Sequence, residues 1–557
     1  MPGIAFWLSH IHIEISGMEA MRRDAQERLT STYVELLSWP NVNAYPKAGR
    51  REWTGLAVLI LPTLLLSIDM SVLHLAVPTL TKDLKPTGAQ LLWISDVYGF
   101  LIAGFLITMG TLGDRIGRRR LLLIGGAAFA VASVLAAYAT TPLLLILARA
   151  LLGVAGATLM PSTLSLISNM FLDSRQRTKA IGLWMTGFTG GMVVGPLVGG
   201  LLLEWFWWGA VFLLNVPVML VLLVAGPLLL PEYRAPGAGR LDLASVVLSL
   251  GAVLPTIYGI KEFAAYGLSW PSALAVAAGA ILAAVFVRRQ RALAAPLLDL
   301  KLFANRKFSA SLGALMLVTL LGPGLSLLTG QYLQLSAGLS PLAAGMWMVP
   351  MTAAVIVGFV ITPRLAGRFR PVHVIAGGLA VAILGMLLLA QVEGTGGLVY
   401  VVVGQSLFFA GTSPLVVLGI DMVVGAAPPE RSGSAAALSE TGQEFSAALG
   451  LAVLGSLAAV VYRAGVAVPD GLDSAAARTA RDTFGGAFAV AAGNPDVSGK
   501  LLAGARAAFA DGLAAAAVAG VVIMVAVTAL VFASLRHLPP LGSPSAESAQ
   551  RSESTST

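Results

Sequence analysis

The chain has 557 residues, of which 57% are hydrophobic and 11% are charged, and its mean hydropathy is +0.83. Soluble domains carry about 25% charged residues, so a soluble enzyme, a nucleic-acid-binding protein and a disordered scaffold are excluded as descriptions of the whole chain. The net charge of +8 is instead typical of a membrane protein, because cytoplasmic loops of such proteins collect Lys and Arg.

Apolar runs of about 20 residues recur along most of the chain, and each is long enough to cross a hydrocarbon core of about 30 Å. Gly, Pro and charged residues separate these runs. The pattern predicts an all-α polytopic membrane protein with 14 transmembrane helices. The predicted spans are 54–78, 92–112, 120–140, 143–167, 179–203, 209–230, 242–262, 271–288, 308–332, 341–363, 372–391, 397–421, 439–462 and 514–535.

The distribution of basic residues predicts the orientation of these spans. An even number of spans places both chain termini on one side of the membrane. Most Lys and Arg residues lie in the loops and tails of that side, whereas the short loops of the other side hold Lys82, Lys85 and Lys261. The positive-inside rule therefore predicts that both termini are cytoplasmic.

Two loops carry related sequences that predict an internal repeat. GDRIGRRR at 113–120 and GRFR at 367–370 are each followed by a glycine pair, and aligning these pairs superposes Arg118 on Arg370. The offset equals eight helices, which predicts two six-helix halves separated by two inserted helices. The expected divisions are a cytoplasmic N-terminal extension (1–52), the N-terminal half (53–232), the inserted helices (233–300), the C-terminal half (301–538) and a disordered cytoplasmic tail (539–557).

One loop within the C-terminal half is unusually long. It connects the last two predicted spans over about 463–513 and is rich in Ala, Gly and Asp. We expect it to be a mobile extracytoplasmic segment that is helical in part.

Five segments carry a resemblance to a known family. They are GTLGDRIGRR at 110–119, LARALLG at 147–153, GMVVGPLVGG at 191–200, and the stretches 68–78 and 439–444. Together they resemble the signatures of the major facilitator superfamily, specifically its fourteen-helix drug:proton antiporters. Within that group, WISDVY at 93–98 is most similar to exporters of quaternary ammonium compounds, dyes and methyl viologen.

The resemblance implies a fold, an activity and a location. The fold is the major facilitator fold, and the activity is export of hydrophobic, mainly cationic, drugs by alternating access and proton antiport across a bacterial inner (plasma) membrane. Expected partners are small-molecule cations or antibiotics, protons and the lipid bilayer, without nucleic acid, and the monomer is expected to function. No enzyme activity, metal or cofactor is expected, because the proton gradient supplies the energy and the sequence has no P-loop. The alternative is a dedicated exporter of one antibiotic or metabolite.

Acidic residues inside predicted spans are the candidates for proton coupling and substrate binding. A charge at the bilayer centre costs about 2.5–3.5 kcal/mol, so each needs a partner, water or a function. Asp69 lies in the first span and Asp96 early in the second, while Glu440 and Glu444 open the thirteenth on one helical face. Two ionised carboxylates on one face repel, which favours a proton on one of them.

An acid of this kind can carry a proton inward and, when ionised, attract an organic cation. The resemblance supports a function for Asp69, Asp96 and Glu440. The alternatives are polar groups that cap a neighbouring helix for the two Asp residues, and a packing role for Glu444. Arg149, the basic residue well inside the fourth span, needs carboxylate or carbonyl partners. It forms either a static pair or, as the resemblance implies, part of a proton relay.

Two further groups are assigned through the resemblance. The 2–3 loop implies a conformational clamp at the cytoplasmic edge, in which Asp114 accepts hydrogen bonds from Arg residues near a helix N-terminus. The clamp residues are Gly110, Asp114, Arg115, Gly117 and Arg118. The span-5 antiporter motif, which implies a bent helix that limits leak, consists of Gly191, Gly195, Pro196, Gly199 and Gly200. Packing of small residues is the alternative for this motif.

Some remaining polar and aromatic residues have simpler expectations. We expect Asp421, at the end of the twelfth span, to be solvated at the cytoplasmic edge. Several aromatic residues either line a cation-binding cavity or lie in the interfacial belt. They are Trp93, Tyr98, Trp184, Tyr332 and Trp347.

Overall fold

The computed structural model describes residues 47–234, 242–267, 269–293, 296–393, 396–428, 432–469 and 472–537, and in these ranges all regular structure is helical. Fourteen helices in this part of the chain are long and apolar enough to cross a membrane. The predicted all-α polytopic architecture is therefore confirmed. The expectations for residues 1–46 and 538–557 lie outside the described residues.

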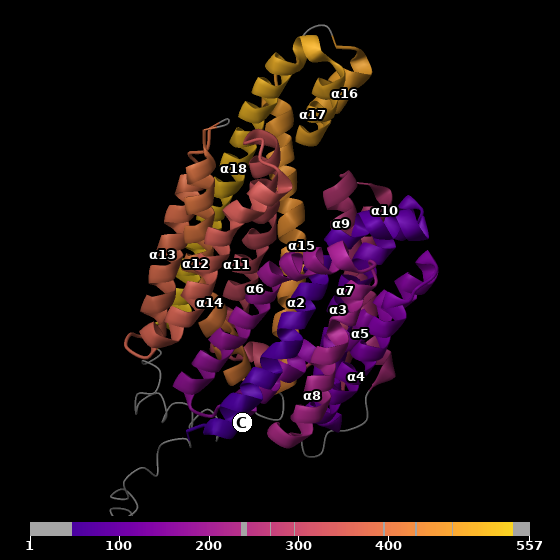
Figure 1. The fold of residues 1–557 in the computed structure, drawn as a ribbon. Coiled ribbons are helices and arrows are strands. Elements are labelled where there is room, and N and C mark those ends of the chain that lie inside the picture. Colours follow the sequence, from indigo (N-terminus) through magenta and orange to yellow (C-terminus); the bar gives the residue numbers. More distant parts are fainter. Residues whose placement is uncertain are drawn as a thin grey trace, which may run out of the picture. The chain divides into compact units, whose positions relative to one another are not determined.

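The helices follow the chain in three groups (Figure 1). The first comprises α2 (Arg50–Leu84), α3 (Gly88–Ile116), α4 (Arg118–Ala137), α5 (Pro142–Met170), α6 (Ser174–Trp205), and α7 (Ala210–Leu213) with α8 (Asn215–Leu229). The inserted pair is α9 (Leu243–Tyr266) and α10 (Trp270–Ala292), followed by the short η1 (Leu300–Ala304). The last group is α11 (Arg306–Gln331) with η2 (Tyr332–Ser336), α12 (Pro341–Ala366), α13 (Pro371–Leu389), α14 (Leu398–Gly425), α15 (Ser432–Gly465), α16 (Ser474–Asp482), α17 (Phe484–Gly493) and α18 (Pro495–Leu535).

Polar side chains fix where several spanning helices begin. Thr87, Thr141, Asp173 and Ser340 precede α3, α5, α6 and α12, and each side chain accepts a hydrogen bond from the backbone amide three residues later. These bonds satisfy amides that the helix itself cannot pair. The sequence therefore specifies helix starts locally, before tertiary packing acts.

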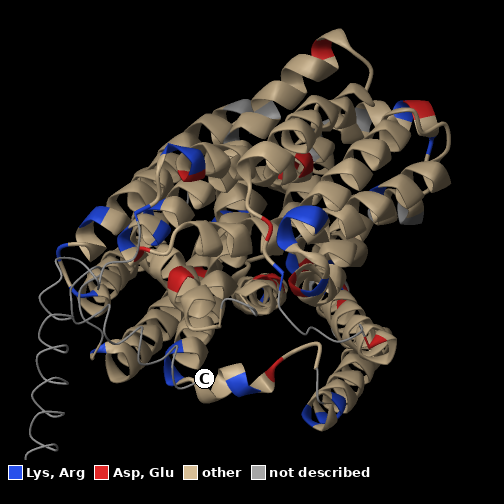
Figure 2. Cartoon of the chain, turned by 90° about the horizontal axis from the view of Figure 1, so that it is seen from below, with Lys and Arg blue, Asp and Glu red and all other residues tan. Residues whose placement is uncertain are grey.

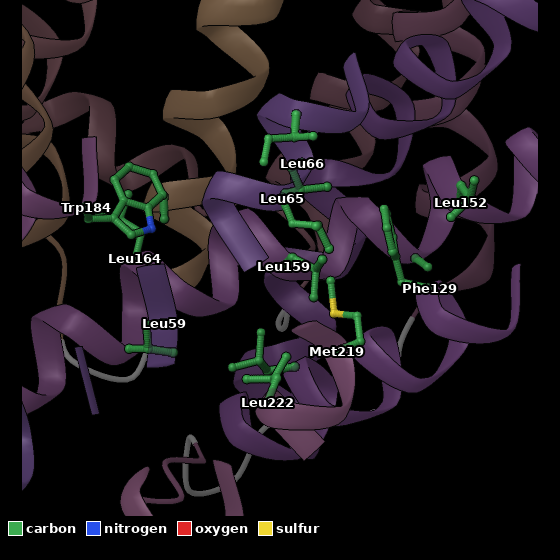
Figure 3. Close-up of a cluster of buried hydrophobic side chains, with 14 of the residues drawn as sticks. Leu59, Leu65, Leu66, Phe129, Leu152, Leu159, Leu164, Trp184, Met219 and Leu222 are labelled. Carbon is green, nitrogen blue, oxygen red and sulfur yellow. The ribbon is translucent and has the colours of Figure 1, made fainter. Parts of the chain in front are cut away.

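Two large apolar clusters stabilise the bundle: one consists mostly of first-half residues but continues into the second half, and the other lies within the second half. In the first half α2 packs on α6, and α5 packs on both α3 and α4. Leu65, Phe129, Trp184 and Met219 belong to the buried cluster shown in Figure 3. In the second half α13 and α12 pack on α14, and α15 packs on α11 and α18.

We call the end of the bundle where α2 begins and α18 ends the terminal end.

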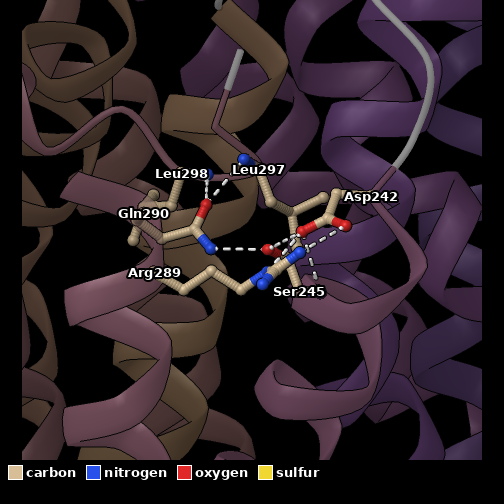
Figure 4. Close-up of polar contacts among 6 residues, drawn as sticks. All are labelled: Asp242, Ser245, Arg289, Gln290, Leu297 and Leu298. Carbon is tan, nitrogen blue, oxygen red and sulfur yellow. Dashed lines mark hydrogen bonds and ion pairs between the residues drawn. The ribbon is translucent and has the colours of Figure 1, made fainter. Parts of the chain in front are cut away.

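A polar cluster closes the inserted pair at the terminal end (Figure 4). Asp242 caps α9 by accepting hydrogen bonds from the Ser245 amide (3.2 Å) and hydroxyl (2.6 Å). Arg289 of α10 donates to both carboxylate oxygens of Asp242, at 2.7 and 3.0 Å. This bidentate geometry ties α9 to α10.

The chain that leaves the inserted pair is fixed at the junction of the two halves. The buried Gln290 side chain accepts hydrogen bonds from the amides of Leu297 (2.7 Å) and Leu298 (3.2 Å). Thr111 of α3 donates to the Leu297 carbonyl oxygen at 2.7 Å. Leu297 and Leu298 also belong to an apolar cluster that Leu438 of α15 covers. The inserted pair is thus attached where α3 and α15 meet.

The helices that contain the last two predicted spans begin earlier than those spans. α15 begins at Ser432, before the predicted start at 439, and α18 begins at Pro495, before the predicted start at 514. Most of 463–513 that the structure describes is helical, and Phe484 stacks on Phe509 with ring centroids 4.2 Å apart. An Ala-rich segment has a strong intrinsic helix preference but a weaker hydropathy signal than a Leu-rich one, so the apolar-run criterion missed these turns.

The Asp242 cluster predicts a pH-dependent contribution to stability. The hydrogen bond from Arg289, and then that from Ser245, lowers the pKa of the Asp242 carboxyl. A carboxyl with a lowered folded-state pKa contributes stability above its ordinary pKa of about 3.9, and this contribution is lost as the pH falls below that value. We expect Asp242→Asn to lower Tm at pH 7, and the difference from wild type to shrink below about pH 4.

Thermal unfolding of the purified protein in detergent between pH 7 and pH 3 measures this effect. Asp482→Asn removes an exposed carboxylate from α16 and serves as the matched control. Its Tm should stay close to that of wild type throughout. A Tm difference for Asp242→Asn that is constant down to pH 3 would contradict the assignment.

Candidate functional site

Asp69 and Arg149 form a buried ion pair within the first half. Arg149 Nη1 on α5 lies 3.0 Å from Asp69 Oδ2 on α2, and the two residues are only 2% and 6% exposed. Asn215 Nδ2 donates to Asp69 Oδ1 at 3.3 Å, and Arg149 Nε donates to the Ile94 carbonyl oxygen at 3.1 Å. Both charges therefore have the partners that burial requires. Sequence reasoning missed Asn215, although it is the one Asn within a predicted span.

Tyr98 connects this ion pair to the second half. Its ring centroid on α3 lies 4.6 Å from Arg149 Cζ, within cation–π range. Its buried hydroxyl has no hydrogen-bond partner among the described residues. Tyr98 also interacts electrostatically with Glu444 of α15. Tyr98 therefore interacts both with the charge pair of the first half and with a carboxylate of the second.

The other aromatic candidates divide into core and surface residues. Trp184 is fully buried and donates to Thr163 Oγ1 at 3.2 Å, while the buried Tyr332 hydroxyl accepts from the Gly397 amide at 2.8 Å. Neither is free to line a cation-binding cavity. Trp93 is exposed and has Phe100 as a neighbour, with ring centroids 6.5 Å apart. Trp347 is also exposed.

Asp96 pairs with a residue of the inserted helices. Lys261 Nζ on α9 lies 3.1 Å from Asp96 Oδ1 on α3, and the Lys261 and Asp96 side chains are 38% and 43% exposed. An ion pair this exposed is worth only about 0.2–1 kcal/mol. The expectation that Lys261 lies on a loop is wrong, because α9 continues to Tyr266. The ion pair between Lys261 and Asp96 was not predicted, because Lys261 lies at the edge of a predicted span.

Glu440 and Glu444 lie inside α15 and do not open it, because this helix begins at Ser432. Glu440 is half-buried and Glu444 is exposed. The two carboxyl groups interact electrostatically with each other. Lys261 in turn interacts electrostatically with Glu444. Carboxylates from both halves are therefore brought around one ammonium of the inserted pair.

The predicted clamp residues join α3 to the start of α15. Asp114 accepts a hydrogen bond from Arg118 with one oxygen, and from the Ser434 amide (3.1 Å) with the other. A carboxylate at a helix N-terminus is favoured by the partial positive charge there. A Cβ on Gly110 would lie 2.3 Å from Ala437 Cβ, so the close approach of α3 and α15 requires glycine.

Two other predicted clamp residues, Gly117 and Arg115, lie at the end of α3. Gly117 has φ +113°, a backbone conformation that favours glycine, and it separates α3 from α4. Arg115 is largely buried and interacts electrostatically with Asp242 at the start of α9. The clamp region therefore also borders the inserted pair.

A second polar contact between the halves was not predicted. Asp421 on α14 accepts hydrogen bonds from Arg177 Nε (2.5 Å) and Thr178 Oγ1 (2.8 Å) of α6. The expectation that Asp421 is solvated is wrong: it is 3% exposed, because the first half covers it. Between α5 and α15, the hydroxyls of Ser165 and Ser432 lie 2.6 Å apart. Figure 2 views the bundle from this end and shows Lys and Arg positions around it.

The antiporter-motif glycines face α2. A Cβ on Gly191 or Gly195 would meet a serine hydroxyl of α2 at 2.1 or 2.0 Å, and one on Gly199 would lie 2.9 Å from Val72. These three glycines are four residues apart and form one helical face. They pack against the turns of α2 on either side of Asp69. A Cβ added to Gly200 would have no described heavy atom within 4 Å. The side chain of Pro196 lies outside the described residues.

The Arg177–Asp421 contact predicts a change in accessibility. Removing one member of a buried ion pair costs about 3–5 kcal/mol, so Asp421→Asn should open the terminal end. The natural chain has no cysteine, which allows Ser165→Cys to report opening. We expect maleimide to label this cysteine at least about tenfold faster in the Asp421→Asn background.

The matched reporter for this experiment is Ser133→Cys, a buried position bonded to Asn215 within the first half. Its labelling should be unchanged by Asp421→Asn. Equal acceleration at both positions would mean general unfolding, and no acceleration at Ser165→Cys would mean that the contact does not hold the halves together.

Comparisons with known proteins agree with this architecture. A model of the Major Facilitator Superfamily matches residues 59–451. The chain is 43% identical over 488 residues to the multidrug efflux pump LfrA of Mycolicibacterium smegmatis, covering 87% of this chain and 97% of LfrA. It is 34% identical over 467 residues to the methyl viologen resistance protein SmvA of Salmonella typhimurium, covering 82% and 93%.

A solved structure supports the fold alone. The crystal structure of the human organic anion transporter MFSD10 (TETRAN) matches with a TM-score of 0.54 at 17% identity, covering 85% of this chain and 99% of that one. The family match and the relatives confirm the family expectation drawn from the motifs. The chain is a multi-pass membrane transporter that belongs to the Major Facilitator Superfamily.

Proposed function

We propose that this transporter exports hydrophobic, mainly cationic, drugs from the cytoplasm in exchange for protons. The observation that carries the proposal is the group of carboxylates within the spanning helices of both halves: Asp69, Asp96, Glu440 and Glu444. An ionised carboxylate attracts an organic cation, and the protonated form does not. The names of the relatives LfrA and SmvA, a multidrug efflux pump and a methyl viologen resistance protein, support the same substrate class.

The contacts at the terminal end support an alternating-access cycle. Asp114 and Asp421 hold the halves together at that end. With the cytoplasmic termini favoured by the distribution of Lys and Arg, this is a state closed to the cytoplasm. In this state the accessible carboxylates of Asp96 and Glu444 exchange a bound cation for a proton from outside. Proton loss to the cytoplasm, after the halves have switched, restores cation binding.

The energy for export comes from the proton gradient. One proton exchanged for one monovalent cation moves no net charge and uses only the pH difference, about 1.4 kcal/mol per pH unit. A second proton adds about 2.3 kcal/mol per 100 mV of membrane potential. The acids in the spans are sufficient for either stoichiometry.

We assign different tasks to the buried and the exposed acids. Asp69 is enclosed by Arg149 and Asn215, so we place it in proton coupling. Its protonation would release the Arg149 guanidinium, which is permanently charged. Asp96, Glu440 and Glu444 are more accessible, and we place them in cation attraction.

Transport in liposomes tests the function. The purified protein is reconstituted with an imposed pH gradient, and internal pH is followed after addition of ethidium, methyl viologen or a neutral antibiotic. We expect both cations to evoke proton movement, and Asp69→Asn with Glu440→Gln to abolish it. No proton movement with either cation, together with a response to a neutral antibiotic, would favour the dedicated exporter.

A single substitution separates coupling from substrate contact at Asp69. Because the Asp69 carboxylate is buried in an ion pair, we expect Asp69→Asn to reduce transport of cationic and neutral substrates together, by at least about tenfold. Asp83→Asn, at the exposed end of the same helix, is the control and should transport normally. Selective loss of cationic substrates would instead place Asp69 in the binding site.

A further inference from the structure

We propose that Lys261 of the inserted pair acts as a tethered cation that competes with transported cations for Asp96, and thereby sets the apparent affinity of the exporter for its substrates. The inference rests on the proposed function and deepens it by naming a residue that determines specificity. It also gives the inserted pair a task in the transport pathway.

The surroundings of the Lys261 ammonium match those that an organic cation requires. Nζ lies 3.1 Å from Asp96 Oδ1 and 4.6 Å from the ring centroid of Phe100, one turn further along α3. Trp93 lies beside Phe100 and is exposed. A carboxylate next to aromatic faces is the combination that recognises quaternary ammonium groups. Lys261 therefore occupies the features that a substrate cation would use.

The Lys261 ammonium can be displaced easily from the Asp96 carboxylate. Both side chains are more than one third exposed, so solvent screens their attraction. Lys also carries its charge on a flexible stem of four carbons. The Asp69–Arg149 pair of the same half is the contrast, because both its members are almost fully buried and hydrogen-bonded to further groups. An incoming cation can displace the ammonium from Asp96, but a guanidinium locked at Asp69 is not replaced in this way.

A second acid is in place to receive the displaced ammonium. Glu444 on α15 interacts electrostatically with Lys261, and α9 packs against both α3 and α15. Lys261 can therefore turn from a carboxylate of the first half to one of the second without leaving α9. Occupation of Asp96 by a substrate is thus sensed in the other half.

The position of Lys261 depends on the inserted pair. Gln290 and Leu297 fix the far end of this pair to the junction of α3 and α15. Two six-helix halves alone would leave the Asp96 carboxylate without this internal competitor.

The test compares Lys261→Met, which keeps an unbranched side chain one atom shorter and removes its charge, with Lys261→Arg, which keeps the charge. Ethidium binding to the purified protein is followed by fluorescence, and ethidium-driven proton movement is followed in liposomes. We expect Lys261→Met to tighten ethidium binding and to lower its KM, each by about two- to fivefold. Lys261→Arg should remain close to wild type, and the KM of a neutral antibiotic should not change.

An Asp96→Asn background distinguishes competition from long-range electrostatics. In this background the carboxylate for which Lys261 and ethidium compete is absent. Adding Lys261→Met should therefore no longer tighten ethidium binding. An equal tightening in both backgrounds overturns the proposal. Lys82→Met removes an exposed ammonium at the end of α2 and should leave binding unchanged.

The two readouts separate the failure of the inference from that of the proposed function. Unchanged ethidium affinity in both Lys261→Met and Lys261→Gln rejects the tethered cation, whatever the transport result. Tighter ethidium binding without any cation-evoked proton movement in wild type supports the competition and rejects proton antiport.

Discussion

A charged side chain that lies inside the hydrocarbon layer needs an opposite charge, hydrogen bonds or water, because an unpaired charge there costs several kcal/mol. The described parts of this chain meet that requirement in two ways. Asp69, Asp114 and Asp421 are buried and paired with Arg149, Arg118 and Arg177. Asp96 is partly exposed and Glu444 is exposed, and both interact with Lys261. The first kind fixes helices in place, and the second kind leaves charge free to exchange partners.

These two kinds of charge also divide the bundle along its length. Asp114, which accepts a hydrogen bond from the Ser434 amide, and Asp421, which pairs with Arg177, hold the two halves together at the terminal end. The Asp69 pair lies within one half, next to the glycine face through which α6 contacts α2. A change in the protonation of Asp69 would therefore alter the packing of helices that form the closed end. This arrangement lets a local change of charge reach the contacts between the halves.

Much of the fold could be predicted because its information is local. Spans follow from apolar length, helix starts from capping residues, and the need of Arg149 for an acid from the cost of its burial. The identity of that acid is a tertiary fact, as is the Arg177–Asp421 contact, whose members lie 244 residues apart in the sequence. The partnership of Lys261 with Asp96 and the start of α18 at Pro495 were missed for another reason. Hydropathy identifies the apolar middle of a helix and says little about polar or Ala-rich ends.

Two separate carboxylate contacts help to close the terminal end, one between α3 and α15 and the other between α6 and α14. If the two contacts loosen independently, the probability that both are open at once is the product of two small probabilities. A membrane that stores energy as a proton gradient is discharged by any transporter that opens at the wrong moment. Two contacts therefore suppress futile openings more strongly than one contact does. In the proposed antiport cycle, substrate and proton would loosen both contacts together, so the productive switch is slowed less.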